Sequence, residues 1–346
     1  MNETRTNAGS LLLAFFASAI ALLIAVVVVP GKIAYAEDAE AQVVASWQIG
    51  SPTPSNVIAT LYDDGSLIIA GSGDTKNYTY YSKPVWYENH RFDIKKVVFE
   101  DGVTPDNLMY YFYCCMNLSS INRIPETVTN MSYTFAGTNN LDTKVNEYLN
   151  ELKDIPELPA GLTNMNYTFQ NCRGLEKSPI IPDSVTTMTG TFMNCTSLVS
   201  VPNLPANLTN MSSTFASCHC LESVPEIPEG VTLMGNTFGM CSALKSAVYI
   251  PSTVINMNNT FQRCTNLTII PKGWSIPEGL ASNRTMYTLA IKEGMDAPYG
   301  KNNKLKTYCD PSDYERLSTD PRLTWDTWNR ELISGYPDDQ EGTAEG

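Results

Sequence analysis

The stretch LVSVPNLPANLTNMSSTFASC, residues 198–218, decides the fold, because close variants of it recur through the middle of the chain. Its phenylalanine, Phe215, belongs to a series whose members are 23 residues apart, with a single spacing of 34. The series is Phe112, Phe135, Phe169, Phe192, Phe215, Phe238 and Phe261. A period of this size is typical of a solenoid, in which each coil buries its apolar face only against its neighbours. The sequence therefore predicts a stack of about seven coils.

A cysteine follows the phenylalanine by three residues in all coils but the second, and a leucine follows three residues later. The cysteines of this series are Cys115, Cys172, Cys195, Cys218, Cys241 and Cys264. A periodic cysteine behaves as a small buried hydrophobe, which predicts a column of packed thiols. Neighbouring coils ~4.8 Å apart would also allow a disulfide. The three cysteines outside the series, Cys114, Cys220 and Cys309, are better candidates for a bridge.

Other positions of the repeat are equally regular. A valine or leucine lies seven residues before the phenylalanine, a methionine or leucine four before it, and usually a threonine one before it. An asparagine lies five before it in most coils, and we expect the Asn and Thr side chains to bond to backbone groups of neighbouring coils. Prolines such as Pro202 and Pro205 punctuate the rest of each coil. Because proline cannot donate to a strand ladder, the strands should be short, about three residues around 222–224.

The repeat array, residues 104–271, has flanks of different composition. Residues 37–103 predict an N-terminal β cap with a hairpin over 57–62 and 66–70 and a strand over 95–99, since Asp-Gly pairs follow alternating apolar runs. The one long spacing contains an insertion, 142–154, whose apolar residues recur at helical spacing. Residues 272–334 should form a degenerate coil and a C-terminal cap, and 335–346 an acidic disordered tail.

Residues 1–36 have the pattern of a secretory signal peptide. Arg5 precedes an apolar run over 11–29, and Ala34 and Ala36 form an A-x-A site, which predicts cleavage after Ala36. The apolar run is also almost long enough to span a bilayer, so an uncleaved anchor is the alternative. In either case the remaining chain is expected to be secreted or at the cell surface, with membrane contact only through this segment.

Composition and motifs exclude several classes of function. The chain has 36 acidic and 23 basic residues and a net charge of −13, which disfavours nucleic-acid binding and favours a soluble monomer. Nucleotide-binding, hydrolase and metalloprotease motifs are missing, and there are only two histidines. The pair Cys218 and Cys220 around His219 is too closely spaced to favour a metal site. Turn acids such as Glu226 and Glu229 lack the partner geometry of a glycosidase. We expect no enzyme activity, cofactor or metal.

Three tyrosines, Tyr110, Tyr133 and Tyr167, occupy the position two before the phenylalanine in the first three coils. An aromatic stripe can dock a peptide or a sugar ring, so these residues are a candidate ligand surface. The alternative is that they pack beneath the N-terminal cap or the insertion. We favour packing, because the stripe ends where the insertion ends.

The repeat resembles the BspA-like (Treponema-type) leucine-rich repeat, whose turn carries a phenylalanine, a cysteine three residues later and a leucine three after that. The resemblance covers roughly residues 95–290, and Met replaces the Ile of many members. It implies a leucine-rich-repeat-like solenoid and a bacterial surface or secreted protein that binds a protein or glycan partner, with no catalytic residues. The function expected from it is adhesion or protein–protein interaction; a glycan-acting enzyme and a passive surface spacer are the alternatives.

Overall fold

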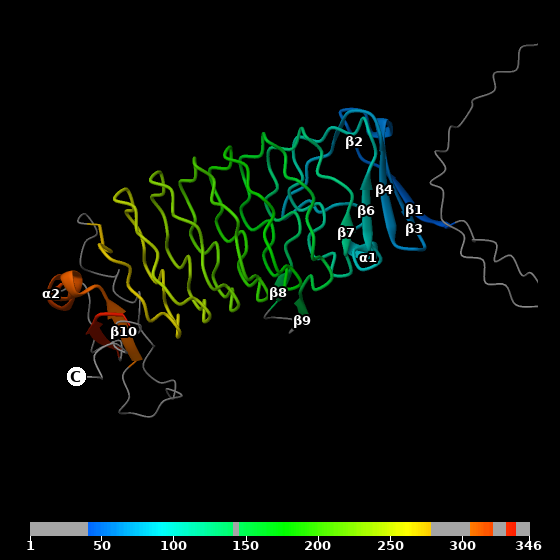
Figure 1. The fold of residues 1–346 in the computed structure, drawn as a ribbon. Coiled ribbons are helices and arrows are strands. Elements are labelled where there is room, and N and C mark those ends of the chain that lie inside the picture. Colours follow the sequence, from blue (N-terminus) through cyan, green and yellow to red (C-terminus); the bar gives the residue numbers. More distant parts are fainter. Residues whose placement is uncertain (1–40, 141–144, 278–304, 321–329, 337–346) are drawn as a thin grey trace, which may run out of the picture. The chain divides into compact units, whose positions relative to one another are not determined.

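The computed structural model describes residues 41–140, 145–277, 305–320 and 330–336 (Figure 1). The predicted signal peptide and almost all of the predicted acidic tail lie outside these residues. Strands and irregular backbone dominate, with few helices, as the repeat pattern predicted.

A five-stranded sheet forms the N-terminal part of the described chain. Its strands are β1 (Val43–Gln48), β3 (Val57–Tyr62), β4 (Ser66–Gly71), β6 (Lys96–Phe99) and β7 (Ser120–Ile121), in the order β1-β3-β4-β6-β7. The hairpin predicted from the Asp-Gly turn is present as β3 and β4. Because β4, β6 and β7 are parallel and β7 belongs to the first coil, the sheet runs directly into the coils. Small elements flank it: β2 (Gly50–Ser51), β5 (Asp74–Thr75), the 3-10 turn η1 (Pro54–Asn56) and α1 (Tyr87–His90).

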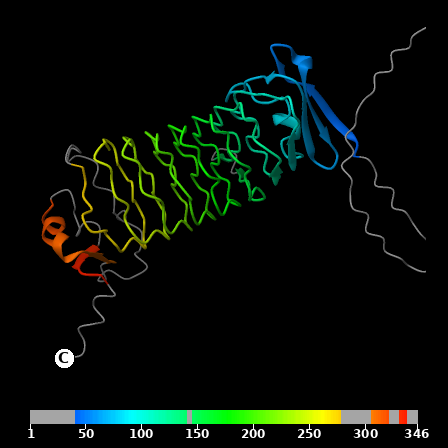
Figure 2. The ribbon, with the colours of Figure 1, turned by 45° about the horizontal axis from the view of Figure 1, so that its top comes forward.

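The coils lie side by side, joined by a ladder of single-residue parallel bridges (Figures 1 and 2). The ladder runs through the position five before the phenylalanine, namely Asn107, Asn130, Asn164, Thr187, Asn210, Leu233 and Asn256. The strand predicted around 222–224 is wrong, because residues 221–229 contain no strand. Pro225 and Pro228 remove two backbone donors from this part of the coil, and the continuous pairing lies on the asparagine side instead.

The phenylalanines form one column in which neighbouring ring centroids are 5.5–5.8 Å apart and the rings are nearly parallel. The predicted Val or Leu, Met, Cys and Leu positions are buried beside them. A further apolar position, eleven before the phenylalanine, was not among those predicted. Its members are Ile124, Leu158, Ile181, Leu204 and Ile227, all buried, and the partly buried Ile250. Each of these residues directly precedes a proline. Because proline was interpreted as a strand breaker, the 23-residue recurrence of the apolar residue before it was overlooked.

Threonine side chains link adjacent coils. The Thr214 hydroxyl lies 2.7 Å from the carbonyl of Met188 in the preceding coil and 2.7 Å from that of Met211 in its own, and equivalent threonines repeat the contact. The asparagines act differently from the prediction. The Asn210 side chain accepts a hydrogen bond from the amide of Ser212 in the same coil, at 3.0 Å. The asparagine therefore shapes its own turn, and the threonine joins the coils.

The cysteine column consists of buried thiols. The Cys218 thiol donates to the carbonyl of Phe192 in the preceding coil at 3.1 Å, and Cys172, Cys195, Cys241 and Cys264 make the same contact with earlier coils. All nine cysteines are thiols, so the suggested bridge among Cys114, Cys220 and Cys309 does not form. Cys220 is exposed, whereas the other eight are buried.

The helix predicted over 142–154 is wrong for the residues described there. Strand β8 (Thr138–Asn140) pairs antiparallel with β9 (Val145–Glu147), and residues 148–150 have no regular secondary structure. Leu149 and Leu152 are nevertheless buried. The Leu149 amide donates to the Asn171 carbonyl and the Leu149 carbonyl accepts from the Gly174 amide, so the backbone of Leu149 pairs with another coil and not within a helix. A Cβ at Gly174 would lie 2.0 Å from the Asn150 carbonyl oxygen, so only glycine permits this approach.

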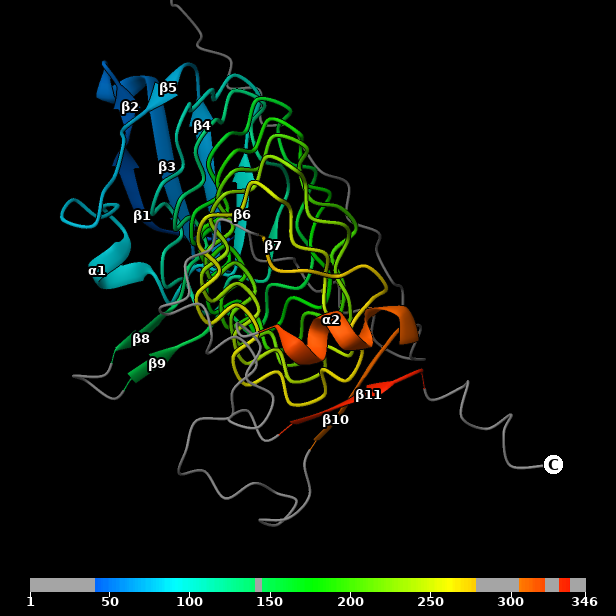
Figure 3. The ribbon, with the colours of Figure 1, turned by 90° about the vertical axis from the view of Figure 1, so that its left-hand side faces the viewer.

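The C-terminal described residues pack on the last coil (Figure 3). Strand β10 (Leu305–Cys309) bridges the coil through Tyr308 and Ile269 and pairs with the parallel β11 (Arg330–Ser334). The 3-10 turn η3 (Pro311–Asp313) and α2 (Tyr314–Thr319) follow β10. Trp274 is buried here and donates its indole N–H to the Val248 carbonyl at 2.8 Å.

Candidate interaction surface

The three predicted surface tyrosines form a column beside the phenylalanines. Ring centroids of Tyr110 and Tyr133 are 4.8 Å apart, and those of Tyr133 and Tyr167 are 4.7 Å apart. The Lys83 ammonium lies 3.8 Å from the Tyr110 centroid, and a Cβ at Gly190 would lie 2.4 Å from a Tyr167 ring carbon. A sugar ring stacks on an aromatic face, and these contacts occupy the faces at both ends of the column. The geometry therefore favours packing over ligand binding.

The position of these tyrosines carries a conformational requirement that was not predicted. All seven residues two before a phenylalanine have φ between 55° and 61°. Glycine and asparagine tolerate this left-handed conformation. The occurrence of Gly190, Asn236 and Asn259 at one repeat position could therefore have indicated a positive φ there. Tyrosine is strained there. Tight ring stacking in the first three coils offsets that strain.

Lys83 sits in a cage of tyrosine rings. Its ammonium is 3.8 Å from the Tyr110 centroid, 4.0 Å from Tyr113, 4.5 Å from Tyr80 and 5.5 Å from Tyr87. The nitrogen is shielded from water and has no hydrogen-bond partner among the described residues. Desolvation lowers the pKa of Lys83 to about 8, against smaller opposite effects of Cys114 and Glu88. The cage joins the segment before α1 to the first coil through cation–π contacts.

We expect the stability of the wild-type protein relative to a Lys83→Met variant to rise as pH increases from 8 to 10. Because the folded-state pKa of Lys83 lies below its unfolded value, the unfolded chain binds more protons in this interval. Both proteins share all cysteines and tyrosines, so the difference isolates Lys83. Urea unfolding at several pH values measures it. A difference that falls with pH would mean that cation–π attraction outweighs desolvation.

One position of the repeat recurs in each coil but carries side chains of different chemical types. We term this set of residues the variable row. It consists of the residues twelve before each phenylalanine from Phe135 onward, and of Lys272, which lies 23 residues after the last of them. They are Arg123, Glu157, Ile180, Asn203, Glu226, Tyr249 and Lys272. Arg123 and Asn203 are half-buried and the others are exposed. The residue that directly follows each of the first six is isoleucine or leucine, so the scaffold is uniform while the outward side chain changes from coil to coil.

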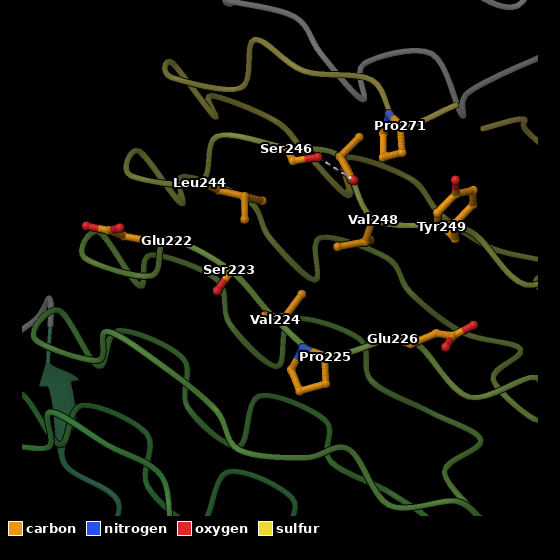
Figure 4. Close-up of a pocket in the computed structure, with 11 residues that line it drawn as sticks. Glu222, Ser223, Val224, Pro225, Glu226, Leu244, Ser246, Val248, Tyr249 and Pro271 are labelled. Carbon is orange, nitrogen blue, oxygen red and sulfur yellow. Dashed lines mark hydrogen bonds between the residues drawn. The ribbon is translucent and has the colours of Figure 1, made fainter. Parts of the chain in front are cut away.

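Two hollows lie along the variable row. The first, of about 540 Å³, is lined by Pro156, Glu157, Pro179 and Ile180 among others. The second, of about 370 Å³, is lined by apolar side chains of three successive coils: Val224 and Pro225, then Leu244 and Val248, then Pro271 (Figure 4). Tyr249 and Glu226 lie at one end of the second hollow and Glu222 at the other (Figure 4). Such concave apolar surfaces with a few polar groups are typical of binding sites.

The described residues contain no three His, Cys, Asp or Glu side chains placed to hold a metal ion. The Cys218 thiol faces the core, and Cys220 is exposed, so this pair does not converge on one site. Among the described helices, none combines the length and apolar character needed to cross a bilayer.

A coil that buries one Phe, Cys and Leu per turn defines a repeat protein of the leucine-rich class. Residues 162–277 match the BspA type leucine rich repeat region in six copies. The predicted resemblance to the BspA-type leucine-rich repeat is confirmed over these residues.

Solved structures of leucine-rich repeat proteins are similar to the chain. One from Eubacterium ventriosum is 22% identical, with a TM-score of 0.40 and coverage of 84% of both chains. One from Bacteroides ovatus is 14% identical, with a TM-score of 0.29 and coverage of 85% of this chain and 100% of that one. The T. pallidum leucine-rich repeat protein is 20% identical, with a TM-score of 0.30 and coverage of 55% and 88%. No curated protein matches the sequence.

Proposed function

We propose that this chain is an exported, non-enzymatic solenoid, covered at both ends, that binds a protein partner at the cell surface and so serves adhesion. The observation that carries the proposal is the variable row. A scaffold that repeats its interior while an outward position changes along the coils presents a linear pattern of different side chains. Ile180, Tyr249 and the two hollows supply the apolar anchors that protein interfaces use, and Glu157, Glu226 and Lys272 supply polar groups around them.

The length of the row suits a protein partner. Phenylalanine centroids of neighbouring coils are 5.5–5.8 Å apart, and steps of this size give a length of roughly 34 Å over seven coils. A standard interface buries about 800 Å² on each partner, and a band this long and ~20 Å wide supplies nearly that area. Because the stacked coils already hold this surface in one conformation, it loses little conformational entropy when a partner binds.

Replacing Ile180 with Asp and Tyr249 with Ala together should lower affinity for a surface or matrix protein partner by about a hundredfold or more, as expected when two anchors are lost. Ile180 is 75% and Tyr249 50% exposed, so the effect on folding should be small. Ile255→Asp is the matched control, because Ile255 is 72% exposed and lies outside the variable row. The measurement is binding to a panel of purified extracellular proteins, with melting temperatures recorded in parallel. Equal losses in both variants would refute the role of the row, and no binding by the wild type would favour a passive spacer.

Export predicts a defined mature terminus. Cells producing the full chain should release, or display, a protein whose first residue is Glu37, because the A-x-A site ends at Ala36. Fractionation followed by N-terminal peptide mass spectrometry checks this. An Ala36→Arg variant should retain the leader. Recovery of uncleaved wild-type chain from the cytosol would contradict export.

A further inference from the structure

The two hollows share one chemical plan. In each, a Pro-Glu pair on one coil faces a large apolar side chain on the next: Pro156 and Glu157 with Ile180, and Pro225 and Glu226 with Tyr249. The glutamate occupies the same repeat position in both cases. The two hollows are therefore copies of one arrangement, set three coils apart.

The carboxylates in these hollows are available to a partner. Neither Glu157 nor Glu226 forms an ion pair with any described residue. The lysines near the second hollow are already engaged, since Lys245 lies 3.5 Å from Glu222 and Lys272 lies 3.5 Å from Asp310. An apolar hollow with one unpaired carboxylate at its rim matches a long side chain that has an aliphatic stem and a cationic end. Arginine and lysine have this chemistry.

We propose that the two hollows together bind an extended basic segment of the protein partner, with one Arg or Lys side chain in each hollow. Glu157 and Glu226 are three coils apart, and the phenylalanine centroids of these coils are separated by steps of 5.5, 5.8 and 5.7 Å, so the hollows lie roughly 17 Å apart. An extended chain rises about 3.1–3.4 Å per residue, so about five residues separate the two basic side chains. The segment lies along the row and crosses Asn203 between the hollows. This inference rests on the proposed function and specifies its partner.

Fluorescence anisotropy with labelled peptides tests the spacing. Two peptides of identical composition, rich in Ser, Thr and Pro, carry two arginines either five or two residues apart. The wider spacing reaches both hollows at once, and we expect it to bind about tenfold or more tightly through the second attachment. Equal affinities for the two peptides would overturn the proposal.

Protein variants test the hollows with a matched control. Glu157→Gln or Glu226→Gln should each reduce the affinity for the widely spaced peptide to that for the closely spaced one, and the double variant should bind neither. Glu229→Gln removes the same charge from an exposed residue outside both hollows and should change affinity less than about twofold. A control as damaging as Glu226→Gln would mean that general charge attraction explains the binding. If spacing has no effect while the Ile180 and Tyr249 variant still loses its protein partner, this inference fails and the proposed function stands.

Discussion

Raising the pH from 8 to 10 is expected to lower the free energy of unfolding of the protein steeply. Burial raises the pKa of the ladder thiols Cys115, Cys172, Cys195, Cys218 and Cys241 well above the ordinary cysteine value. A thiol in the unfolded chain ionises near pH 8.5, whereas the buried thiol stays protonated. Stability from these groups is therefore complete below pH 8.5 and is lost as pH rises, by about 1.4 kcal/mol per thiol per pH unit. Five thiols lose roughly 7 kcal/mol per unit, comparable with the whole stability of a typical domain.

The cysteine contribution is separable by substitution. Cys195→Ala removes one buried thiol and should reduce the slope of unfolding free energy against pH, between 9 and 10, by about 1.4 kcal/mol per unit. Cys220→Ala is the control, because it removes an exposed thiol that lies outside the column. Urea titrations under reducing conditions at each pH provide the slopes. An unchanged slope in Cys195→Ala, or an equal change in both variants, would show that the column does not control alkaline unfolding.

Phe215→Ala should destabilise the protein by about 3–5 kcal/mol, the usual effect of removing a buried phenylalanine. The ring is fully buried and lies between Phe192 and Phe238 at centroid distances of 5.8 and 5.7 Å. Its loss leaves a cavity in the middle of the column that neighbouring rings cannot fill, because their own coils hold them. Since each coil is stabilised by its neighbours, the defect should also weaken the coils on both sides.

Phe92→Ala is the matched control for the column. Phe92 is 39% exposed and lies outside the repeat, so its removal should have an effect of about 1 kcal/mol or less. Chemical unfolding measures both variants, and hydrogen exchange shows which coils lose protection. A Phe215→Ala protein as stable as Phe92→Ala would mean that the column is not the main source of stability.

Much of the scaffold could be predicted from the sequence because stacked coils place equivalent residues in equivalent surroundings. Phe215, Cys218 and Leu221 recur at the same spacing in other coils, and each repetition is an independent indication of burial. The N-terminal hairpin was equally predictable, because its Asp-Gly turn and alternating strands are local signals. The insertion was not. Its apolar residues have helical spacing by coincidence, and the backbone groups of Leu149 pair with Asn171 and Gly174 of another coil.

The sequence by itself thus determined the period, the buried columns and the family of the repeats, since each of these depends on one side chain occupying the same place in successive coils. The tertiary structure alone decided that the tyrosine faces are covered, that Lys83 enters their cage, and that Glu157 and Glu226 border matching hollows. These features depend on distances between residues of different coils or segments. No spacing along the chain specifies such distances until the coils are packed.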